Sequence, residues 1–526
     1  LGVEGFVGDN AYHVVGIAEN ASAVLDGFTI RDGLASDANP NNSGAGIWAK
    51  SGSDFTLRNA RLVDNTASGS DGNGGGVYSQ GTLTVEDATL TGNSAARDGG
   101  GISSDDNSTF INVTVENNSA DRDGGGVNTG NSSIFTNVTA KNNSAGGDGG
   151  GVRGSNSTFT NITAKNNSAV QLGGGVFGSG TFTDVTVENN SADRTGGGIF
   201  IDSASTLTRV DIRGNECDQI RPGGGLFSSG NDVDFTEVTF VGNVGGGDAF
   251  LGGGGAYIEN ATLRAVNVEF IGNEASRGAG LYLTSVDGSL TNTAFSGNTA
   301  SNNGGGLYLG SDSSPAIVNS SFSANSASGE GGAIYTGGTN NFPIIHNSVL
   351  WGNTASSSGD QQQVFVANGQ PLFQNSLIED GVPDGAFNNG DNLSSDPLFV
   401  NASGPDNTPG TEDDNLRLDP GSPAVDAGDS SLLPEDVLDI DGNGDTSEEL
   451  PLDLAGEARR QDVNGGGFVV DMGAYEAIGT PLPVELTQFT AQREDEAVVL
   501  NWQTASETNN AGFEVQRQQT SGAGVA

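Results

Sequence analysis

The sequence predicts an all-β fold in which a long parallel β-helix, or β-solenoid, precedes an acidic, loop-rich region and a small terminal module. Three observations predict it. A phrase of the type NNSADRDGGGVNTG, residues 117–130, returns about every 25 residues. Within each unit, as in STFTNITAKNNSA, apolar residues alternate with Thr, Ser or Asp, which is typical of strands. Glycine makes up 85 of 526 residues, and its fixed period indicates a repeat fold rather than disorder.

Charge and composition exclude several classes of partner. The chain has 66 acidic and 20 basic residues and a formal charge of -46, so we expect it to repel nucleic acid and anionic membranes and to attract cations. Adaptation to a salty habitat explains this acidity equally well. The single cysteine, Cys217, leaves no intrachain disulfide. No apolar run has the length of a transmembrane helix, so no membrane insertion is expected.

Three ladders of residues define the repeat. Each unit has a triplet of small residues, followed in nearly every unit by an aliphatic residue, and the triplets recur at 23- to 30-residue steps. The second ladder consists of Asn65, Asn93, Asn118, Asn143, Asn167, Asn190, Asn215, Asn243, Asn273, Asn298, Asn325 and Asn353. The third is one large apolar residue per unit, as in Phe110, Phe135, Phe159, Phe182, Phe235 and Leu263.

Each unit reads as one coil with three short strands and turns. Coils stack at about 4.8 Å, so the stack buries what a single coil cannot. One Phe, Val or Ile per face is then sufficient, provided that it stays in register. Stacked asparagines are expected to hydrogen-bond along the axis. The glycines permit positive φ and close backbone approach at the corner before the inward aliphatic residue.

One stretch resembles a known repeat. FSANSASGEGGAIY, Phe322–Tyr335, has the F-x-x-N and G-G-A-I elements of chlamydial-type polymorphic outer-membrane proteins. The first element recurs at Phe240, Phe270 and Phe295, each followed by the ladder asparagine. The resemblance implies a right-handed parallel β-helix that is secreted or lies at a cell surface and is often adhesive.

The carboxyl-terminal third predicts two further parts after a β-helix over residues 1–395. Residues 396–478, with NLRLDPGSPAVDAGD and VDMGAYE, resemble the terminal region of bacterial choice-of-anchor β-helix proteins. Residues 479–526 contain a stretch, 481–518, that resembles the fibronectin-like module of type IX secretion cargo in the Bacteroidota. That resemblance implies export. Only three strands of a sandwich that needs about seven are evident, so the module is truncated, processed, or completed by a neighbouring subunit.

The motif DIDGNGDTSEEL, residues 439–450, is a candidate calcium loop. Oxygen ligands at alternate positions, with Gly444 at the sixth, match the first half of an EF-hand loop. The twelfth position departs from that pattern, since it is Leu450, but Glu448 or Glu449 can substitute. An acidic turn without metal is the alternative. The candidate ligands are Asp439, Asp441, Asn443 and Asp445.

A second loop, GPDNTPGTEDDN, offers a weaker calcium candidate. Its ligands would be Asp406, Asn407, Asp413 and Asp414. Both loops are expected to stiffen a junction rather than to catalyse a reaction.

Catalytic candidates are sparse. Lys141 and Lys165 occupy equivalent places in adjacent coils, but Glu116 and Glu188 occupy the same place, which indicates a solvated position. His13 and His346 lie far apart in the array. Cys217 replaces a small residue in a corner and reads as buried filler. We therefore expect no enzyme, with a polysaccharide lyase or hydrolase as the alternative.

A row of threonines, Thr114, Thr139, Thr163 and Thr186, is expected to face outward on four consecutive coils and to end at Asp211. Such a row binds ordered water or carbohydrate, or is simply a good solvent-facing strand.

Together these features predict a secreted, extracellular or bacterial cell-surface structural or adhesive rod. Its expected partners are surface glycans or further copies of itself, joined head to tail through the terminal module.

Overall fold

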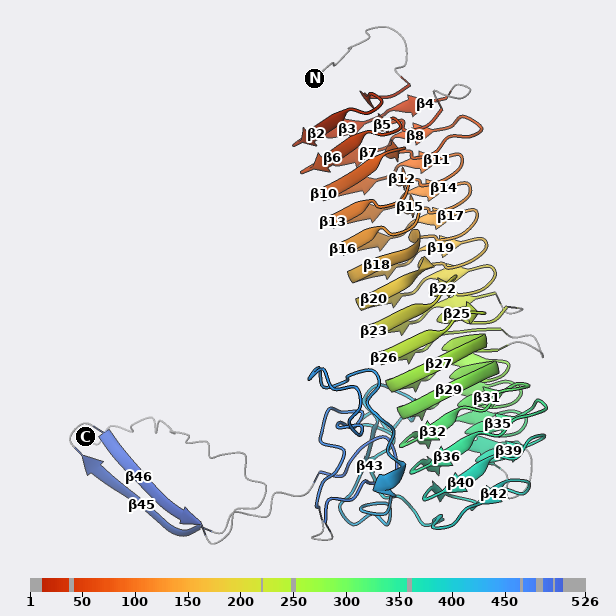
Figure 1. The fold of residues 1–526 in the computed structure, drawn as a ribbon, viewed down its shortest axis with the longest axis vertical. Coiled ribbons are helices and arrows are strands. Elements are labelled where there is room, and N and C mark those ends of the chain that lie inside the picture. The colour runs from red at the N-terminus through yellow and green to blue at the C-terminus, as the bar shows by residue number, and fades with distance from the viewer. Residues whose placement is uncertain are drawn as a thin grey trace, which may run out of the picture.

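The computed structural model describes residues 12–36, 42–218, 221–246, 252–356, 362–463, 467–478, 486–494 and 497–504. It confirms the expected fold class. The chain winds into a right-handed parallel β-solenoid whose coils stack into a rod (Figure 1). The one helix in the described residues is the single 3-10 turn η1, Ser430–Leu432.

Each coil contributes strands to three faces. The first face, which follows the glycine triplet, consists of β1 (Val15–Ile17), β5 (Ile47–Ala49), β9 (Val77–Ser79), β12 (Ile102–Ser104), β15 (Val127–Thr129), β22 (Ile199–Ile201), β25 (Leu226–Ser229), β31 (Leu307–Leu309), β35 (Ile334–Thr336) and β39 (Val364–Val366).

The second face is divided by a bend. It consists of β2 (Ser22–Asp26), β3 (Thr29–Arg31), β6 (Asp54–Arg58), β7 (Arg61–Val63), β10 (Thr82–Thr91), β13 (Thr109–Glu116), β16 (Ile134–Lys141), β23 (Ser205–Arg213), β26 (Val233–Val241), β32 (Ala316–Val318), β33 (Ser321–Ser323), β36 (Ile344–His346), β37 (Val349–Trp351), β40 (Leu372–Gln374), β41 (Leu377–Ile378) and β42 (Phe387–Asn388). In β18 (Val152–Lys165), β20 (Val176–Glu188), β27 (Ala256–Ile271) and β29 (Leu281–Ser296), the first and second faces run together.

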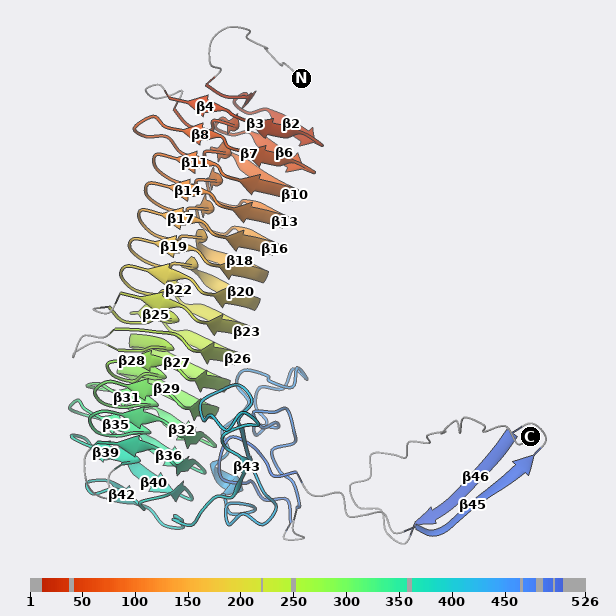
Figure 2. The ribbon, with the colours of Figure 1, turned by 180° about the vertical axis from the view of Figure 1, so that it is seen from behind.

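The third face is a column of two-residue strands, which Figure 2 shows along one edge of the rod. They are β4 (Leu34–Ala35), β8 (Thr66–Ala67), β11 (Ser94–Ala95), β14 (Ser119–Ala120), β17 (Ser144–Ala145), β19 (Ser168–Ala169), β21 (Ser191–Ala192), β24 (Glu216–Cys217), β28 (Glu274–Ala275), β30 (Thr299–Ala300), β34 (Ser326–Ala327) and β38 (Thr354–Ala355).

The core consists of like residues in register. Phe110 pairs with Phe135, Phe135 with Phe159, and Phe159 with Phe182, and their rings stack at 4.8, 4.9 and 4.5 Å. All four are buried. This confirms that one large apolar residue per coil builds a continuous core.

The expected continuation of this ladder at Leu263 is wrong. Leu207 and Phe235 follow Phe182, but the next residue in that column is Ala265, while Leu263 pairs with Val233. The missing volume moves to a neighbouring column, where Phe240, Phe270, Phe295 and Phe322 stack instead. A coil has several inward positions, so a large side chain can change column without changing the coil.

The asparagine ladder runs unbroken from Asn65 to Asn353 and confirms the prediction. Asn143 is typical. Its Nδ2 donates to Asn167 Oδ1 of the next coil at 3.0 Å and to the Val115 carbonyl at 2.9 Å, while its Oδ1 accepts the Asn118 N–H at 2.9 Å. The side chain therefore satisfies buried backbone groups at each corner.

The backbone at the same corner requires glycine in the triplet for two reasons, a positive φ and a close approach of the next coil. Gly149 has a φ of +68°, which L-residues with side chains rarely adopt. A Cβ on Gly150 would lie 2.3 Å from the Ser168 carbonyl oxygen, so this position admits no side chain. The inward aliphatic residue that follows, Val152, is buried as expected.

Residues 396–478 fold back against the side of the rod (Figures 1 and 2). Among its described residues, one pair of antiparallel strands forms, β43 (Phe399–Asn401) with β44 (Asn415–Leu418). Its apolar residues, including Leu418, Val425 and Met472, form a small second core with Val349 and Leu377 of the rod.

The motif VDMGAYE lies in this junction. The Gly473 N–H donates to the Asn347 carbonyl at 2.7 Å, the Ala474 N–H donates to Ser321 Oγ at 2.9 Å, and the Tyr475 hydroxyl donates to Glu269 at 3.1 Å. The motif that resembles anchor-type proteins therefore attaches the region to the rod.

The described part of the terminal module is one antiparallel hairpin, β45 (Leu486–Glu494) with β46 (Ala497–Thr504). It exposes Phe489 and Val498. The other residues of the expected fibronectin-like module lie outside the described part of the chain.

Candidate functional site

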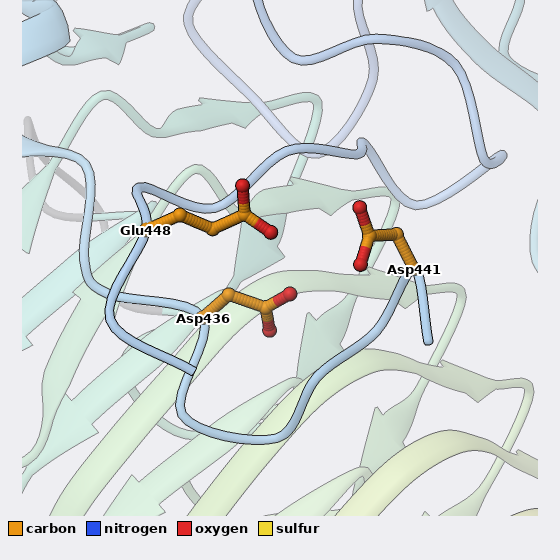
Figure 3. Close-up of side chains that lie close together, drawn as sticks. All are labelled: Asp436, Asp441 and Glu448. Carbon is orange, nitrogen blue, oxygen red and sulfur yellow. The ribbon is translucent and has the colours of Figure 1, made fainter. Parts of the chain in front are cut away.

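Three carboxylates of the acidic loop converge: Asp436, Asp441 and Glu448 (Figure 3). Their ligand oxygens lie within 4.8 Å of one another. Asp441 and Glu448 are residues that the sequence singles out, whereas Asp436 precedes the EF-hand-like pattern and was missed. An antiparallel bridge between Glu435 and Glu449 closes the loop and brings Asp436 opposite Glu448.

The other residues of the motif shape the loop. Asp439 Oδ1 accepts the Gly444 N–H at 3.1 Å, and Asp445 Oδ1 accepts the Ser447 N–H at 3.0 Å. Asn443 Nδ2 donates to Asp441 at 2.9 Å and to Glu448 at 2.5 Å. The structure therefore leaves Asp439 and Asp445 outside the converging group.

The electrostatics of this group favour a cation. Burial raises the pKa of Asp436; the Ile440 N–H opposes this, and the charges of Asp441, Asp439 and Glu448 add to it. A divalent cation would offset the repulsion among these carboxylates. Carboxylate oxygens are the hard ligands that Ca²⁺ takes in proteins, so the chemistry of the group fits the ion.

The second acidic loop contacts the rod instead of gathering its carboxylates into a cluster. Asp414 accepts hydrogen bonds from Ser296 of the rod at 2.8 Å and from the Gly410 N–H at 2.6 Å. Asp406 accepts the Thr408 N–H at 2.7 Å, Asp413 accepts the Thr411 hydroxyl at 2.5 Å, and Asn407 adopts a positive φ. Among the described residues, these carboxylates do not converge as the first three do.

The four predicted threonines do form one outward column, in which Thr114, Thr139, Thr163 and Thr186 are in direct register and Asp211 follows. All four are partly exposed. Beside them runs a second, exposed asparagine ladder with positive φ, in which Asn137 donates to Asn112 and Asn161 to Asn137 at 2.8 Å. This part of the rod is therefore hydroxyl- and amide-rich in a strongly acidic protein.

An outer aromatic ladder was not predicted. The rings stack at 4.6–5.5 Å along the first face in the order Phe177, Phe200, Phe227, Tyr257, Tyr282, Tyr308, Tyr335 and Phe365. Four of them are buried as a separate cluster. Each ring directly follows an inward aliphatic residue, so strand alternation alone places it in solvent. The recurrence of an aromatic residue at that place was the signal available.

The catalytic candidates are engaged elsewhere. Lys165 pairs with Glu188 at 2.8 Å and Lys141 with Glu116 at 3.4 Å, along one outward column. The Cys217 thiol is buried and donates to the Arg221 carbonyl, and burial raises its pKa to about 12. His13 precedes β1 and His346 lies in β36, so the two histidines belong to coils that are far apart.

Two family models match the chain. The model of the right-handed β-helix region matches residues 100–263, and the repeat of the Chlamydia polymorphic membrane protein matches residues 292–310 and 319–337. The second range contains the stretch that resembles these repeats. No curated protein matches the chain. The matches indicate a β-helix repeat protein with surface, adhesin-like character. Among the described residues, no helix is long and apolar enough to cross a membrane.

Proposed function

We propose that this chain is a secreted, non-enzymatic rod that acts as a structural or adhesive element on a bacterial surface or outside the cell. The observation that carries the proposal is the coincidence of the polymorphic membrane protein repeats with coils of the solenoid. The resemblance of residues 481–518 to type IX secretion cargo supports export. The Lys–Glu pairs and the buried Cys217 support a role without catalysis.

Adhesion is tested by coating beads with the purified chain and measuring their retention on host or partner cells. Retention that is lost when soluble chain competes supports adhesion. Retention no greater than that of beads coated with an unrelated acidic protein contradicts it.

We further propose that copies associate head to tail, with the terminal module of one rod contacting the first coils of the next. The described part of the module is a two-stranded hairpin that exposes Phe489 and Val498; such a hairpin is marginal alone, and a sheet edge that is open invites pairing. A contact of this type that does not close produces a filament. Electron microscopy of the native material tests it: filaments that repeat at one rod length are expected, and isolated rods contradict it.

A calcium ion at Asp436, Asp441 and Glu448 is proposed as a stiffening element of the junction region. The convergence of these carboxylates supports it. The second acidic loop is proposed to act through its contact with the rod rather than through metal.

Glycan binding on the threonine column is the second candidate function. The hydroxyl-rich column at Thr139 and Thr163 favours it, because aligned hydroxyls can pair with sugar hydroxyls. A glycan array tests it. Binding that Thr139→Lys and Thr163→Lys abolish supports this face, and binding that both variants retain contradicts it.

A further inference from the structure

A cavity of about 310 Å³ lies where the carboxyl-terminal region meets the rod. Its floor is an outward column of three consecutive coils, in which Asp211 of β23, Thr239 of β26 and Glu269 of β27 are in register. Glu412, from the loop that docks on the rod, forms part of its wall, and Glu237 lines it. The cavity is therefore built by two parts of the chain that lie far apart in sequence.

The two arginines that line the cavity already have carboxylate partners. Arg213 Nε donates to Asp211 Oδ2 at 2.7 Å, and its Nη2 lies 3.2 Å from Glu412 Oε1. Arg209 donates to Asp184, which lies outside the cavity, at 2.6 and 3.3 Å. Their N–H groups are thus largely taken up by these ion pairs.

Acceptors remain. Asp211 Oδ1 is buried and has no hydrogen-bond partner among the described residues. The Glu269 carboxyl is contacted by the Tyr475 hydroxyl at Oε1 alone, and Glu237 adds a further carboxylate. Four carboxyl groups thus line the cavity with two arginines. A fitting ligand is positively charged and donates hydrogen bonds.

We propose that this cavity binds a protonated amine, namely the ammonium group of a small diamine or of a lysine side chain. An ammonium carries three N–H donors, and Asp211, Glu269 and Thr239 line the cavity with oxygen acceptors. The volume lies at the lower end of the range for small-molecule sites and suits an aminoalkyl chain. Among the described residues, three carboxylates converge at metal-binding distance only at Asp436, so this cavity suits a larger cation than a bare metal ion.

Proton release provides a specific signature. Burial raises the pKa of Glu269, the Tyr475 hydroxyl opposes this shift, and the charge of Glu412 adds to it. Arg417, which lies over the Tyr475 ring, and Arg213 are the cations nearby on the two sides. An ammonium that contacts Glu269 favours the ionised carboxyl, so binding should release a proton at any pH at which this carboxyl is partly protonated.

Isothermal titration calorimetry of the full chain tests this with 1,4-diaminobutane, Nα-acetyl-lysine amide and the neutral 1,4-butanediol. We expect both amines to bind at one site with heats that depend on buffer ionisation, and the diol not to bind. A tighter diamine indicates a free amine as the natural ligand, and a tighter lysine derivative indicates a partner's side chain.

Variants locate the site. Glu269→Gln and Asp211→Asn should each weaken amine binding at least about tenfold. The matched control Glu86→Gln, on an outward position of β10, should leave it unchanged and thereby exclude general attraction to an acidic surface. Circular dichroism confirms that each variant is folded. The proposal would be overturned if the diol bound as well as the amines, or if no amine bound at about 10 mM. It would also be overturned if both cavity variants still bound the amines, or if the control variant lost binding to the same extent.

Discussion

At each corner of the solenoid, a buried asparagine holds neighbouring coils together, a role that apolar side chains have in most protein cores. In the solenoid, Asn143 connects its own coil to the coils before and after it, and it satisfies backbone groups that water cannot reach. This explains why a phrase with so few apolar residues recurs. Its polar atoms are paired, and buried polar groups are costly only when they lack partners.

Asn143→Ala should therefore destabilise the rod strongly. It removes the acceptor of the buried Asn118 N–H and the side-chain donor to the Val115 carbonyl, at about 1–3 kcal/mol for each group left unsatisfied, whereas Asn167 Oδ1 keeps the backbone N–H of residue 143. Urea unfolding followed by circular dichroism measures the loss. Asn142→Gly is the matched control, because Asn142 is exposed and has a positive φ that glycine accepts. Equal effects of the two changes would contradict the role of the ladder.

Gly150→Ala tests the close approach of coils at the same corner. Its new Cβ would lie 2.3 and 2.4 Å from carbonyl oxygens of the next coil, so the coils must separate locally. We expect a fall of several degrees in the melting temperature, measured by calorimetry. Gly16→Ala, where a Cβ meets nothing within 4 Å, should leave it within about 2 degrees. An unchanged melting temperature for Gly150→Ala would show that the corner tolerates side chains.

At the scale of the coil, periodicity predicts most of what the structure shows. The strands, the inward aliphatic residues and the asparagine ladder follow from a repeat whose units must match in register. Leu263 was assigned to the wrong column because the repeat fixes the coil but not which inward position takes the large side chain. The outer ladder around Tyr282 escaped prediction because its burial depends on neighbouring rings and turns that alternation within one strand does not reveal.

The acidic loop shows the same limit at a candidate site. The pattern at 439–450 proposes Asp441, and Glu448 or Glu449, as ligands, but a linear template has no place for Asp436, which the pairing of Glu435 with Glu449 brings opposite Glu448. Local spacing predicts ligands within a loop, whereas the closing of the loop decides which of them meet.

Calcium should stabilise the region around this loop. At a concentration of about one hundred times the dissociation constant, binding contributes about 2.7 kcal/mol to the free energy of unfolding. Thermal melts with Ca²⁺ and with a chelator measure the shift, which Asp436→Asn and Asp441→Asn should reduce. Asp445→Asn is the control, because Asp445 lies outside the converging group and an amide oxygen can still accept the Ser447 N–H. A melt that the chelator leaves unshifted would contradict the metal.

At the scale of the whole molecule, a buried ionic cluster holds the carboxyl-terminal region together. Arg459 is almost fully buried and lies 3.2 Å from Glu476, while Asp453 and Asp471 accept backbone N–H groups beside it. Burial raises the pKa of Asp471 to about 6 and also raises the pKa of Glu476. Three carboxyl groups surround one guanidinium, so the folded state favours protonation within this group of carboxyls.

The region should consequently detach more easily as pH rises. A carboxyl group with a raised pKa contributes stability that is complete below its unfolded pKa of 3.8 and is lost as pH rises through about 6. Urea unfolding near pH 5 and pH 8, read by proteolysis within residues 396–478, measures it. Asp471→Asn should lower this pH dependence, although Glu476, Glu269 and Asp414, whose pKa values are also raised, retain part of it. A variant as pH-dependent as the wild type would contradict this assignment.

The access of antibodies to the rod on intact cells distinguishes surface display from a location inside the cell. Antibodies raised against residues 82–213 are applied to unbroken cells of the organism that produces the protein and, in parallel, to lysed cells. We predict equal labelling of both, with the signal removed when intact cells are treated with protease. Labelling that appears only after lysis would place the rod inside the cell and contradict surface display.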